Sequence, residues 1–342
     1  MKSFAPISLP TFSSAVAKGA AALLFSCAMP VASAASVYIA LGDSITFGET
    51  DLNYVGSFGD RGYVTGYADT LAARNGGVRP AVFNLAIDGE TAASFMSGAG
   101  RTPPVVGRTD TPLALQNLNY QSGNLVTQGQ LFASTVAAQA AAGNTVEAIT
   151  ITLGFNELAS LSALPTDQAL IAIAQTLTSY QANYSAVLNQ VRALAPSANL
   201  SLLGYFNPFP ANPGSPAAPI FNAAGVQLNG IIKILAATYG ASFVDTAGPF
   251  VGSEAAYTFL DEMPAGSVVG GLFGGVLPIG NVHPNAAGYA VIAGQVAAVP
   301  EPGTWALMVA GLLFVACCRR AVPRLAGRSR RGLPAIDGLR SN

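Results

Sequence analysis

The middle of the chain contains short apolar runs that end in glycine or polar residues. Five of these runs predict β-strands, at residues 37–41, 82–86, 148–153, 200–205 and 242–245. A short, β-rich apolar run of this kind is typical of a buried strand in a parallel sheet. The pattern therefore indicates a mainly parallel sheet of five strands.

Helical periodicity separates these runs. Apolar residues recur every three or four positions from Ile173 to Leu194, which predicts a long helix with one buried face and Thr166 as its N-terminal cap. Further helices are expected at residues 130–142, 217–238 and 285–298, and loops at 96–128 and 207–216. Strands that alternate with helices favour an α/β fold with helices on both faces of the sheet.

Composition and charge argue against several classes of protein. The chain has 342 residues, of which 51% are hydrophobic and 10% charged, so it is too apolar to be disordered or a coiled coil. Its length is typical of one large globular domain. Residues 35–318 include seven basic and sixteen acidic residues, whereas both ends of the chain are basic. An acidic body lacks the Lys/Arg surface that a phosphate backbone requires, which argues against nucleic-acid binding.

Residues 1–34 have the pattern of a secretory signal peptide. Lys2 and Lys18 come before an apolar stretch, and Ala32-Ser33-Ala34 supplies the small residues that signal peptidase accepts ahead of its cut. A lipid anchor on Cys27 is the alternative, although Phe25 is bulkier than is usual in lipoprotein signals. Both interpretations predict export.

Residues 300–342 form a second segment outside the expected domain of residues 35–299. Pro300-Glu301-Pro302 precedes sixteen apolar residues at 303–318, and a run of arginines begins at Arg319. Sixteen residues fall short of the roughly 20 that cross a bilayer upright, so a marginal span with a cytoplasmic tail is expected. These features resemble the PEP-CTERM sorting signals of Gram-negative bacteria, which implies processing by a membrane protease of the exosortase type. A permanent C-terminal anchor is the alternative.

The cysteines are confined to these end segments, at positions 27, 317 and 318. The expected mature domain therefore uses neither disulfides nor cysteine chemistry. With one histidine and no cysteine, it also has few metal ligands, and no cofactor is implied.

The candidate chemistry lies just after the expected strands, where open parallel sheets bind their ligands. Ser44 follows the first strand in Gly42-Asp43-Ser44, Gly89 follows the second strand, and Asn156 follows the third. Taken singly, each has a structural explanation as a helix cap, a turn glycine or a turn-forming asparagine.

His283 is the single histidine of the chain, at the entrance of the last expected helix. A serine hydroxyl is a poor nucleophile unless a base with a pKa near neutrality takes its proton as it attacks. If this is a serine enzyme, His283 must be that base.

The four positions together resemble the SGNH/GDSL hydrolase family. The matching segments are residues 40–46, 84–91, 154–156 and 282–285, and the resemblance covers residues 37–298. It implies a flavodoxin-like three-layer α/β/α sandwich and a serine-dependent esterase or lipase. It also implies that Ser44 is the nucleophile, that His283 is the base, and that the N–H groups of Ser44 and Gly89 form the oxyanion hole with the Asn156 side chain.

Two positions depart from the family pattern. Glu157 stands where the family usually has Asp, and Gly280 stands where the acid of the catalytic triad is expected, three residues before the histidine. The neighbouring Asn281 cannot carry a charge. The hypothesis is a Ser–His dyad in which the imidazole is oriented by a backbone carbonyl or by one of three acidic residues, Asp245, Asp261 or Glu262.

The sequence thus predicts an exported ester hydrolase that acts on small-molecule, lipid or polysaccharide esters. Its expected processing partners are signal peptidase and an exosortase-type protease, and residues 303–318 would anchor it to the membrane transiently. Its expected location is the cell surface or the extracellular matrix. The alternative is a surface or matrix protein that keeps the fold but is catalytically weak or inactive, which Gly280 and the sorting tail motivate.

Overall fold

The computed structural model describes residues 34–48, 61–87, 89–98, 126–215, 217–259 and 282–299. One sheet of five parallel strands lies at its centre, in the order β2-β1-β3-β4-β5. The strands are β1 (Ser36–Gly42), β2 (Ala81–Asn84), β3 (Thr145–Thr152), β4 (Asn199–Leu203) and β5 (Ser242–Val244). The predicted five-stranded parallel sheet is confirmed, and each strand overlaps the run that predicted it.

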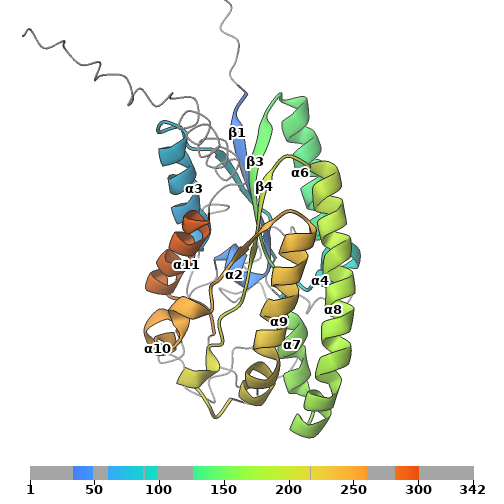
Figure 1. The fold of residues 1–342 in the computed structure, drawn as a ribbon. Coiled ribbons are helices and arrows are strands. Elements are labelled where there is room, and N and C mark those ends of the chain that lie inside the picture. The colour runs from blue at the N-terminus through green and yellow to red at the C-terminus, as the bar shows by residue number, and fades with distance from the viewer. Residues whose placement is uncertain are drawn as a thin grey trace, which may run out of the picture.

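Helices cover both faces of this sheet. In Figure 1, α3 (Gly62–Arg74) and α11 (Ala286–Ala298) lie on one side of the strands. On the other side lie α4 (Ala92–Ser97), α6 (Gln128–Ala141), α8 (Thr166–Leu194) and α9 (Ala218–Thr238). The predicted three-layer α/β/α sandwich is therefore confirmed.

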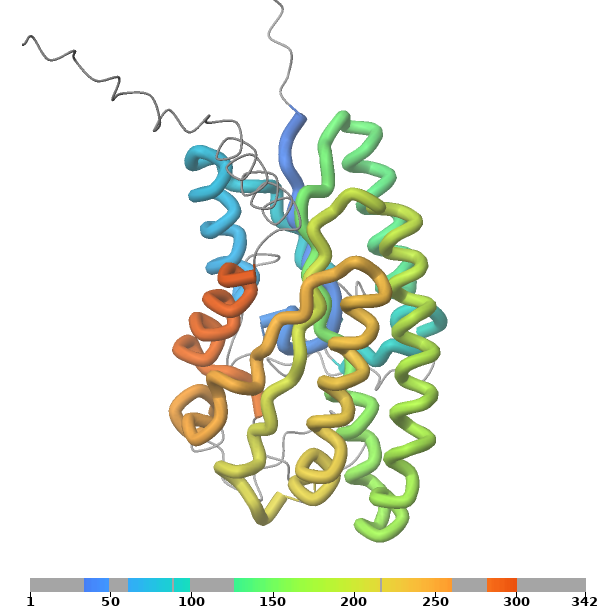
Figure 2. The backbone as a smooth tube through the Cα atoms, viewed as in Figure 1, coloured from blue at the N-terminus to red at the C-terminus, as the bar shows by residue number. Residues whose placement is uncertain are grey.

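The two ends of the domain pack against each other. Figure 2 shows α11 beside α3, although more than two hundred residues separate them along the chain. The Nη2 of Arg74 donates a hydrogen bond to the backbone oxygen of Ala297 at 2.6 Å. The last helix is thus held next to the first long one, which places the residues before α11 close to β1.

The strand order creates a switch point between β1 and β3. The chain passes from β1 to β2 on one side and then crosses to β3 on the other, and ligands of such sheets bind at the carboxyl ends of the strands that flank this point. Gly42 pairs with Thr152 at the end of the two strands. A Cβ on Gly42 would lie 2.1 Å from the Thr152 oxygen, and Gly42 has φ of +129°, so this approach requires glycine.

Several helix predictions need correction. Thr166 was expected to cap α8, but it is the first helical residue: Pro165 occupies the cap position, with φ of −52° and ψ of 142°, and no side chain caps this end. The predictions for α6, α9 and α11 begin within two residues of the observed starts. Helices α3 and α4 were not predicted. Shorter helices were also missed: α2 (Ser44–Phe47), α7 (Phe155–Ala159), α10 (Glu254–Tyr257), and 3₁₀ turns at Ser160–Ala163, Phe209–Ala211 and Gly248–Phe250.

Helix α9 is the single helix in the described ranges that is long and apolar enough to cross a membrane. Its inner side chains, which include Ile220, Leu228 and Ile232, are buried in the core of the sandwich. A core helix passes the same length and hydropathy test. Residues 1–33 of the expected signal peptide, the helix expected at 303–318 and most of the expected loop at 96–128 lie outside the described residues.

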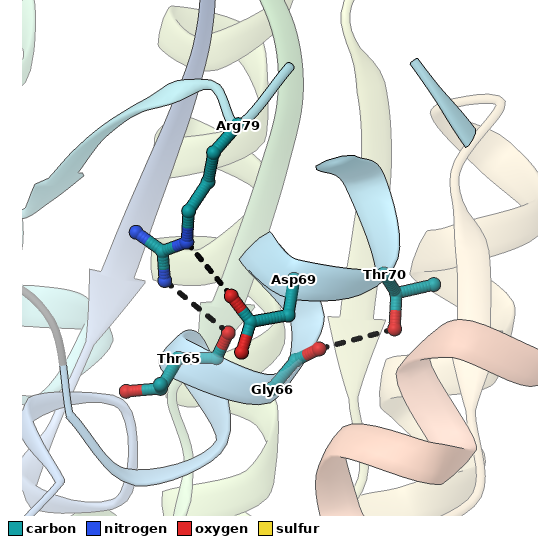
Figure 3. A network of polar contacts seen from close by, with 5 residues as sticks. All are labelled: Thr65, Gly66, Asp69, Thr70 and Arg79. Carbon is teal, nitrogen blue, oxygen red and sulfur yellow. Dashed lines mark hydrogen bonds and ion pairs between the residues drawn. The ribbon is translucent and has the colours of Figure 1, made fainter. Parts of the chain in front are cut away.

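Polar contacts fix the link between α3 and β2. Figure 3 shows Arg79, which follows α3, reaching back to the helix: its Nε pairs with Asp69 at 2.8 Å and its Nη2 donates to the Thr65 backbone oxygen at 3.4 Å. Within the helix, the Thr70 hydroxyl donates to the Gly66 oxygen. The Asp69 side chain is 64% exposed, so this ion pair contributes at most about 1 kcal/mol.

Candidate active site

The turn after β1 is organised by the buried carboxylate of Asp43. Its Oδ1 accepts hydrogen bonds from the Ile45 N–H at 3.1 Å and from the Thr152 hydroxyl at 2.8 Å. Its Oδ2 accepts one from the Tyr205 hydroxyl at 2.5 Å. Asp43, rather than Ser44, therefore caps the short helix α2. The hydroxyl of Ser44 is not used as a cap, and the turn presents it at the end of the sheet.

The structure brings Ser44 and His283 together, although 239 positions separate them in the sequence. The Oγ of Ser44 lies 2.8 Å from the Nε2 of His283, within hydrogen-bonding distance. Both side chains are nearly buried, with exposed fractions of 6% and 4%. This contact is the one that nucleophilic catalysis by serine requires.

The position of His283 follows from the way its loop joins the end of α10. The Phe259 N–H donates to the His283 backbone oxygen at 3.1 Å, and the Asn285 N–H donates to the Tyr257 oxygen at 2.9 Å. The Asn285 side chain then caps α11 by accepting from the Gly288 N–H at 3.0 Å. The imidazole is therefore fixed by backbone contacts on both sides of it.

Burial controls the protonation of this imidazole. Loss of solvent lowers the pKa of His283 from its usual 6.5 to about 3, because the protonated ring is poorly solvated in the interior. The ring is then neutral at physiological pH. A neutral imidazole with an unprotonated Nε2 accepts the hydrogen bond of the Ser44 hydroxyl and can take its proton.

Three potential hydrogen-bond donors were selected from the sequence together with this pair. Within the described part of the chain, the N–H groups of Ser44 and Gly89 have no acceptor. One hydrogen of the Asn156 side-chain amide donates to the Glu90 backbone oxygen at 2.9 Å, which leaves the second amide hydrogen as a further donor. Gly89 has φ of +73°, a conformation that favours glycine. The four residues selected from the sequence thus lie at the carboxyl ends of β1, β2 and β3 and before α11.

Two buried side chains that the sequence did not reveal connect these segments. The amide of Gln128 forms two hydrogen bonds with the Gly42 backbone: its Oε1 accepts from the N–H at 2.6 Å and its Nε2 donates to the oxygen at 2.8 Å. The same Nε2 lies 3.1 Å from Glu90 Oε2. The other carboxylate oxygen of Glu90 accepts from the Ser94 hydroxyl. Gln128 and Glu90 therefore link the serine turn to the segment that contains Gly89.

Glu157 is a buried carboxyl next to this network. Its Oε1 accepts from the Ala92 N–H, the first of α4, at 2.6 Å, whereas its buried Oε2 has no hydrogen-bond partner among the described residues. Burial is the largest cause that raises its pKa from 4.5 to about 7, and the carboxylates of Asp43 and Glu90 add to this increase. The glutamate at the position where the family usually has Asp therefore stabilises the N-terminus of α4.

The described residues do not identify the acid that would orient His283. Asp245 is exposed after β5, and its Oδ1 accepts from the N–H groups of Ala247 and Gly248 within its own loop. Three of the remaining positions discussed from the sequence, Asp261, Glu262 and Asn281, lie outside the described residues, as does Gly280. Within the described ranges, no cluster of three or more His, Cys, Asp or Glu side chains is arranged to hold a metal ion.

A model of the GDSL-like lipase/acylhydrolase family matches residues 40–291, and a model of the PEP-CTERM protein-sorting motif matches residues 298–320. The chain belongs to the GDSL-like lipase/acylhydrolase family. Both resemblances noted from the sequence are thereby confirmed, and the chain is an ester hydrolase by family. The GDSL match extends from β1 into α11 and so includes Ser44, Gly89, Asn156 and His283.

Solved structures of similar fold include three hydrolases. A phospholipase A1 from Streptomyces albidoflavus is 21% identical, with 77% of this chain and 98% of that chain covered and a TM-score of 0.45. An acetylxylan esterase from Geobacillus stearothermophilus is 17% identical, with 78% and 96% covered and a TM-score of 0.46. A lipase from a goat rumen metagenome is 20% identical, with 76% and 95% covered and a TM-score of 0.48. The chain matches none of the curated proteins compared with it.

The Gln128 contacts predict a specific loss of stability. Gln128→Leu keeps the size of the side chain but leaves the Gly42 backbone groups and Glu90 Oε2 without this partner, so the free energy of unfolding should fall by about 2–4 kcal/mol. Urea denaturation measures the change. Gln175→Leu, at an exposed position of α8, is the matched control and should shift stability by less than about 0.5 kcal/mol. Equal effects of the two substitutions would contradict the linking role of Gln128.

The raised pKa of Glu157 predicts that the stability difference between the parent and a Glu157→Gln variant depends on pH. Because its pKa is raised from 4.5 to about 7 on folding, the folded state keeps a proton that the unfolded state releases, and stability falls as pH rises through this window. Glu157→Gln removes this effect. The free energy of unfolding of the variant, relative to the parent, should increase by about 1 kcal/mol or more between pH 4.5 and 7.5. A difference that does not depend on pH would show that Glu157 ionises normally in the folded protein.

Proposed function

We propose that this protein is an exported serine ester hydrolase in which Ser44 is the nucleophile and His283 the general base. The contact of 2.8 Å between Ser44 Oγ and His283 Nε2 carries this proposal. The family of the chain already makes it an ester hydrolase, and this contact supplies the pair that the reaction needs.

The proposed reaction has two halves. In the first, the Ser44 Oγ attacks the ester carbonyl carbon while His283 Nε2 takes its proton, and the tetrahedral oxyanion is bound by the N–H groups of Ser44 and Gly89 and by the Asn156 amide. The intermediate collapses as the alcohol leaves with the proton from His283. In the second half, water attacks the acyl-serine, His283 takes the water proton, and the carboxylic acid departs as the proton returns to Ser44.

The place of action follows from the C-terminal motif. The sorting motif at residues 298–320 supports export and C-terminal processing by an exosortase-type protease. We place the signal peptide at residues 1–34, the hydrolase domain at 35–299 and the sorting segment at 300–342. Esters outside the inner membrane, on lipids or polysaccharides of the cell surface or matrix, are then the proposed substrates.

Substitutions at the site should reduce turnover without unfolding the protein. With p-nitrophenyl butyrate, Ser44→Ala should lower kcat by about 10⁴-fold or more and Asn156→Ala by about 10²–10³-fold. The matched control is Ser185→Ala, whose exposed hydroxyl bonds only to its own helix and whose loss should leave kcat unchanged. Absence of activity in a well-folded parent protein would favour the catalytically inactive surface protein instead. Full activity in Ser44→Ala would exclude this nucleophile.

The pH profile tests His283. Since its pKa is lowered from 6.5 to about 3, kcat/KM should stay near its plateau well below pH 6.5 and fall only as the imidazole becomes protonated. The profile is measured between about pH 4 and pH 8 in the parent and in Glu157→Gln. The variant removes the titration of Glu157, whose pKa of about 7 lies inside this range. A loss of activity centred near pH 6.5 in both proteins would show that His283 titrates normally.

A further inference from the structure

A cavity of about 290 Å³ lies beyond the carboxyl ends of β4 and β5. Helix α9 forms one wall, and the segments after β4 and β5 form the others. Its size is at the lower end of the range for ligand pockets. The lining is mostly aromatic and aliphatic and includes Tyr205, Phe221, Val226, Phe250 and Val251, with Glu254 as the one charged residue among its described lining residues.

Residues that line this cavity also contact the residues next to Ser44 and Asn156. Tyr205 lines it, and the hydroxyl of the same tyrosine donates to Asp43, the residue before Ser44. Phe155, the residue before Asn156, lies against two lining rings, with centroid distances of 6.0 Å to Tyr205 and 4.6 Å to Phe221. The cavity therefore lies at the same edge of the sheet as Ser44, next to a residue that bonds Asp43 and to the residue before Asn156.

The surface of the cavity favours an apolar ligand. Its polar side chains are already bonded within the protein: Asn229 bonds both the N–H and the oxygen of Tyr205, and Glu254 accepts from the Gly252 N–H. The amide of Asn207 donates to Asn222. Aromatic and aliphatic groups are left to contact a ligand, and two valines at the rim, Val226 and Val251, are 84% and 76% exposed.

The distance to Ser44 sets the length of that ligand. Ser44 follows β1 and Tyr205 follows β4, and one strand, β3, lies between them in the sheet. Two strand spacings of about 4.8 Å separate the ends by about 10 Å. An extended chain advances about 1.2 Å per bond, so about eight bonds cover this distance. The cavity has the volume of about ten water molecules, enough for an alkyl chain of this size.

We propose that this cavity binds the acyl chain of the ester, and that chains of about eight carbons or more reach it while an acetyl group does not. The proposal rests on the proposed hydrolase function and defines its substrate class: medium-chain and longer acyl esters, as in lipids. The rim valines would contact the part of the chain that enters the cavity, where burial of each CH₂ contributes about 0.8 kcal/mol to binding.

Two glycines of α9 allow a matched test. Gly225 lines the cavity, and a Cβ built on it meets no atom within 4 Å, so Gly225→Phe fills the cavity rather than the core. Gly230 lies on the same helix, its Cβ position is equally open, and it does not line the cavity. Gly230→Phe is therefore the control for the cost of the larger residue in this helix.

The expected result is a loss of activity toward the long-chain ester alone. In Gly225→Phe, kcat/KM for p-nitrophenyl octanoate should fall at least about tenfold while kcat/KM for p-nitrophenyl acetate changes less than about twofold, and Gly230→Phe should change neither. Circular dichroism melting confirms that both variants are folded. Equal losses with both esters, or an unchanged rate with octanoate, would overturn the assignment of the cavity.

A binding measurement separates the cavity from the chemistry. Octanoate should displace a dansylated fatty acid from the parent protein and from Ser44→Ala, and the probe should not bind to Gly225→Phe. If the parent hydrolyses no ester but binds the probe in this way, the hydrolase proposal fails and the cavity assignment stands. If the parent hydrolyses p-nitrophenyl acetate but does not bind the probe, the cavity assignment fails and the hydrolase proposal stands.

Discussion

The buried carboxylate of Asp43 is the constraint on which the active site depends. A carboxylate without exposure to water is tolerated in a protein interior only when its oxygens accept hydrogen bonds. Asp43 accepts from Ile45, from Thr152 at the end of β3 and from Tyr205 after β4, and so joins the ends of three strands. Burial and the neighbouring Asp43 raise the pKa of Tyr205 well above its usual value, which keeps the tyrosine protonated as a donor. These three hydrogen bonds hold the turn that presents Ser44 in place.

The segments that contain the proposed oxyanion donors are joined by a second buried network. Gln128 bonds the backbone of Gly42 and the side chain of Glu90, and the backbone oxygen of Glu90 accepts from Asn156. These contacts connect the segments after β1, β2 and β3. Because oxyanion donors act by being fixed before the reaction, the proposed mechanism gives this network a positioning role that needs no contact with the substrate.

The sequence was informative wherever a local pattern carries the structure. Apolar runs located the five strands, and the rule that ligands bind at strand ends selected Ser44 and Asn156. Helix α3 was not predicted, because glycines and small residues at positions 62–74 weaken its apolar periodicity. The role of Gln128 had no local signal, since its partners lie 86 and 38 residues away. Tyr205 was predicted to be the last residue of a strand, whereas the observed β4 ends at Leu203 and Tyr205 lies just beyond it, so the strand-end rule was not applied to it.

The central claim is that Ser44 is a nucleophile activated by His283, and a fluorophosphonate label tests it most directly. Mass spectrometry of the labelled protein identifies the modified residue in the parent and in the variants His283→Ala and Ser185→Ala. We expect the label on Ser44 in the parent and in Ser185→Ala, and labelling slower by orders of magnitude in His283→Ala. Labelling of another residue, or equally fast labelling of Ser44 without His283, would contradict the account.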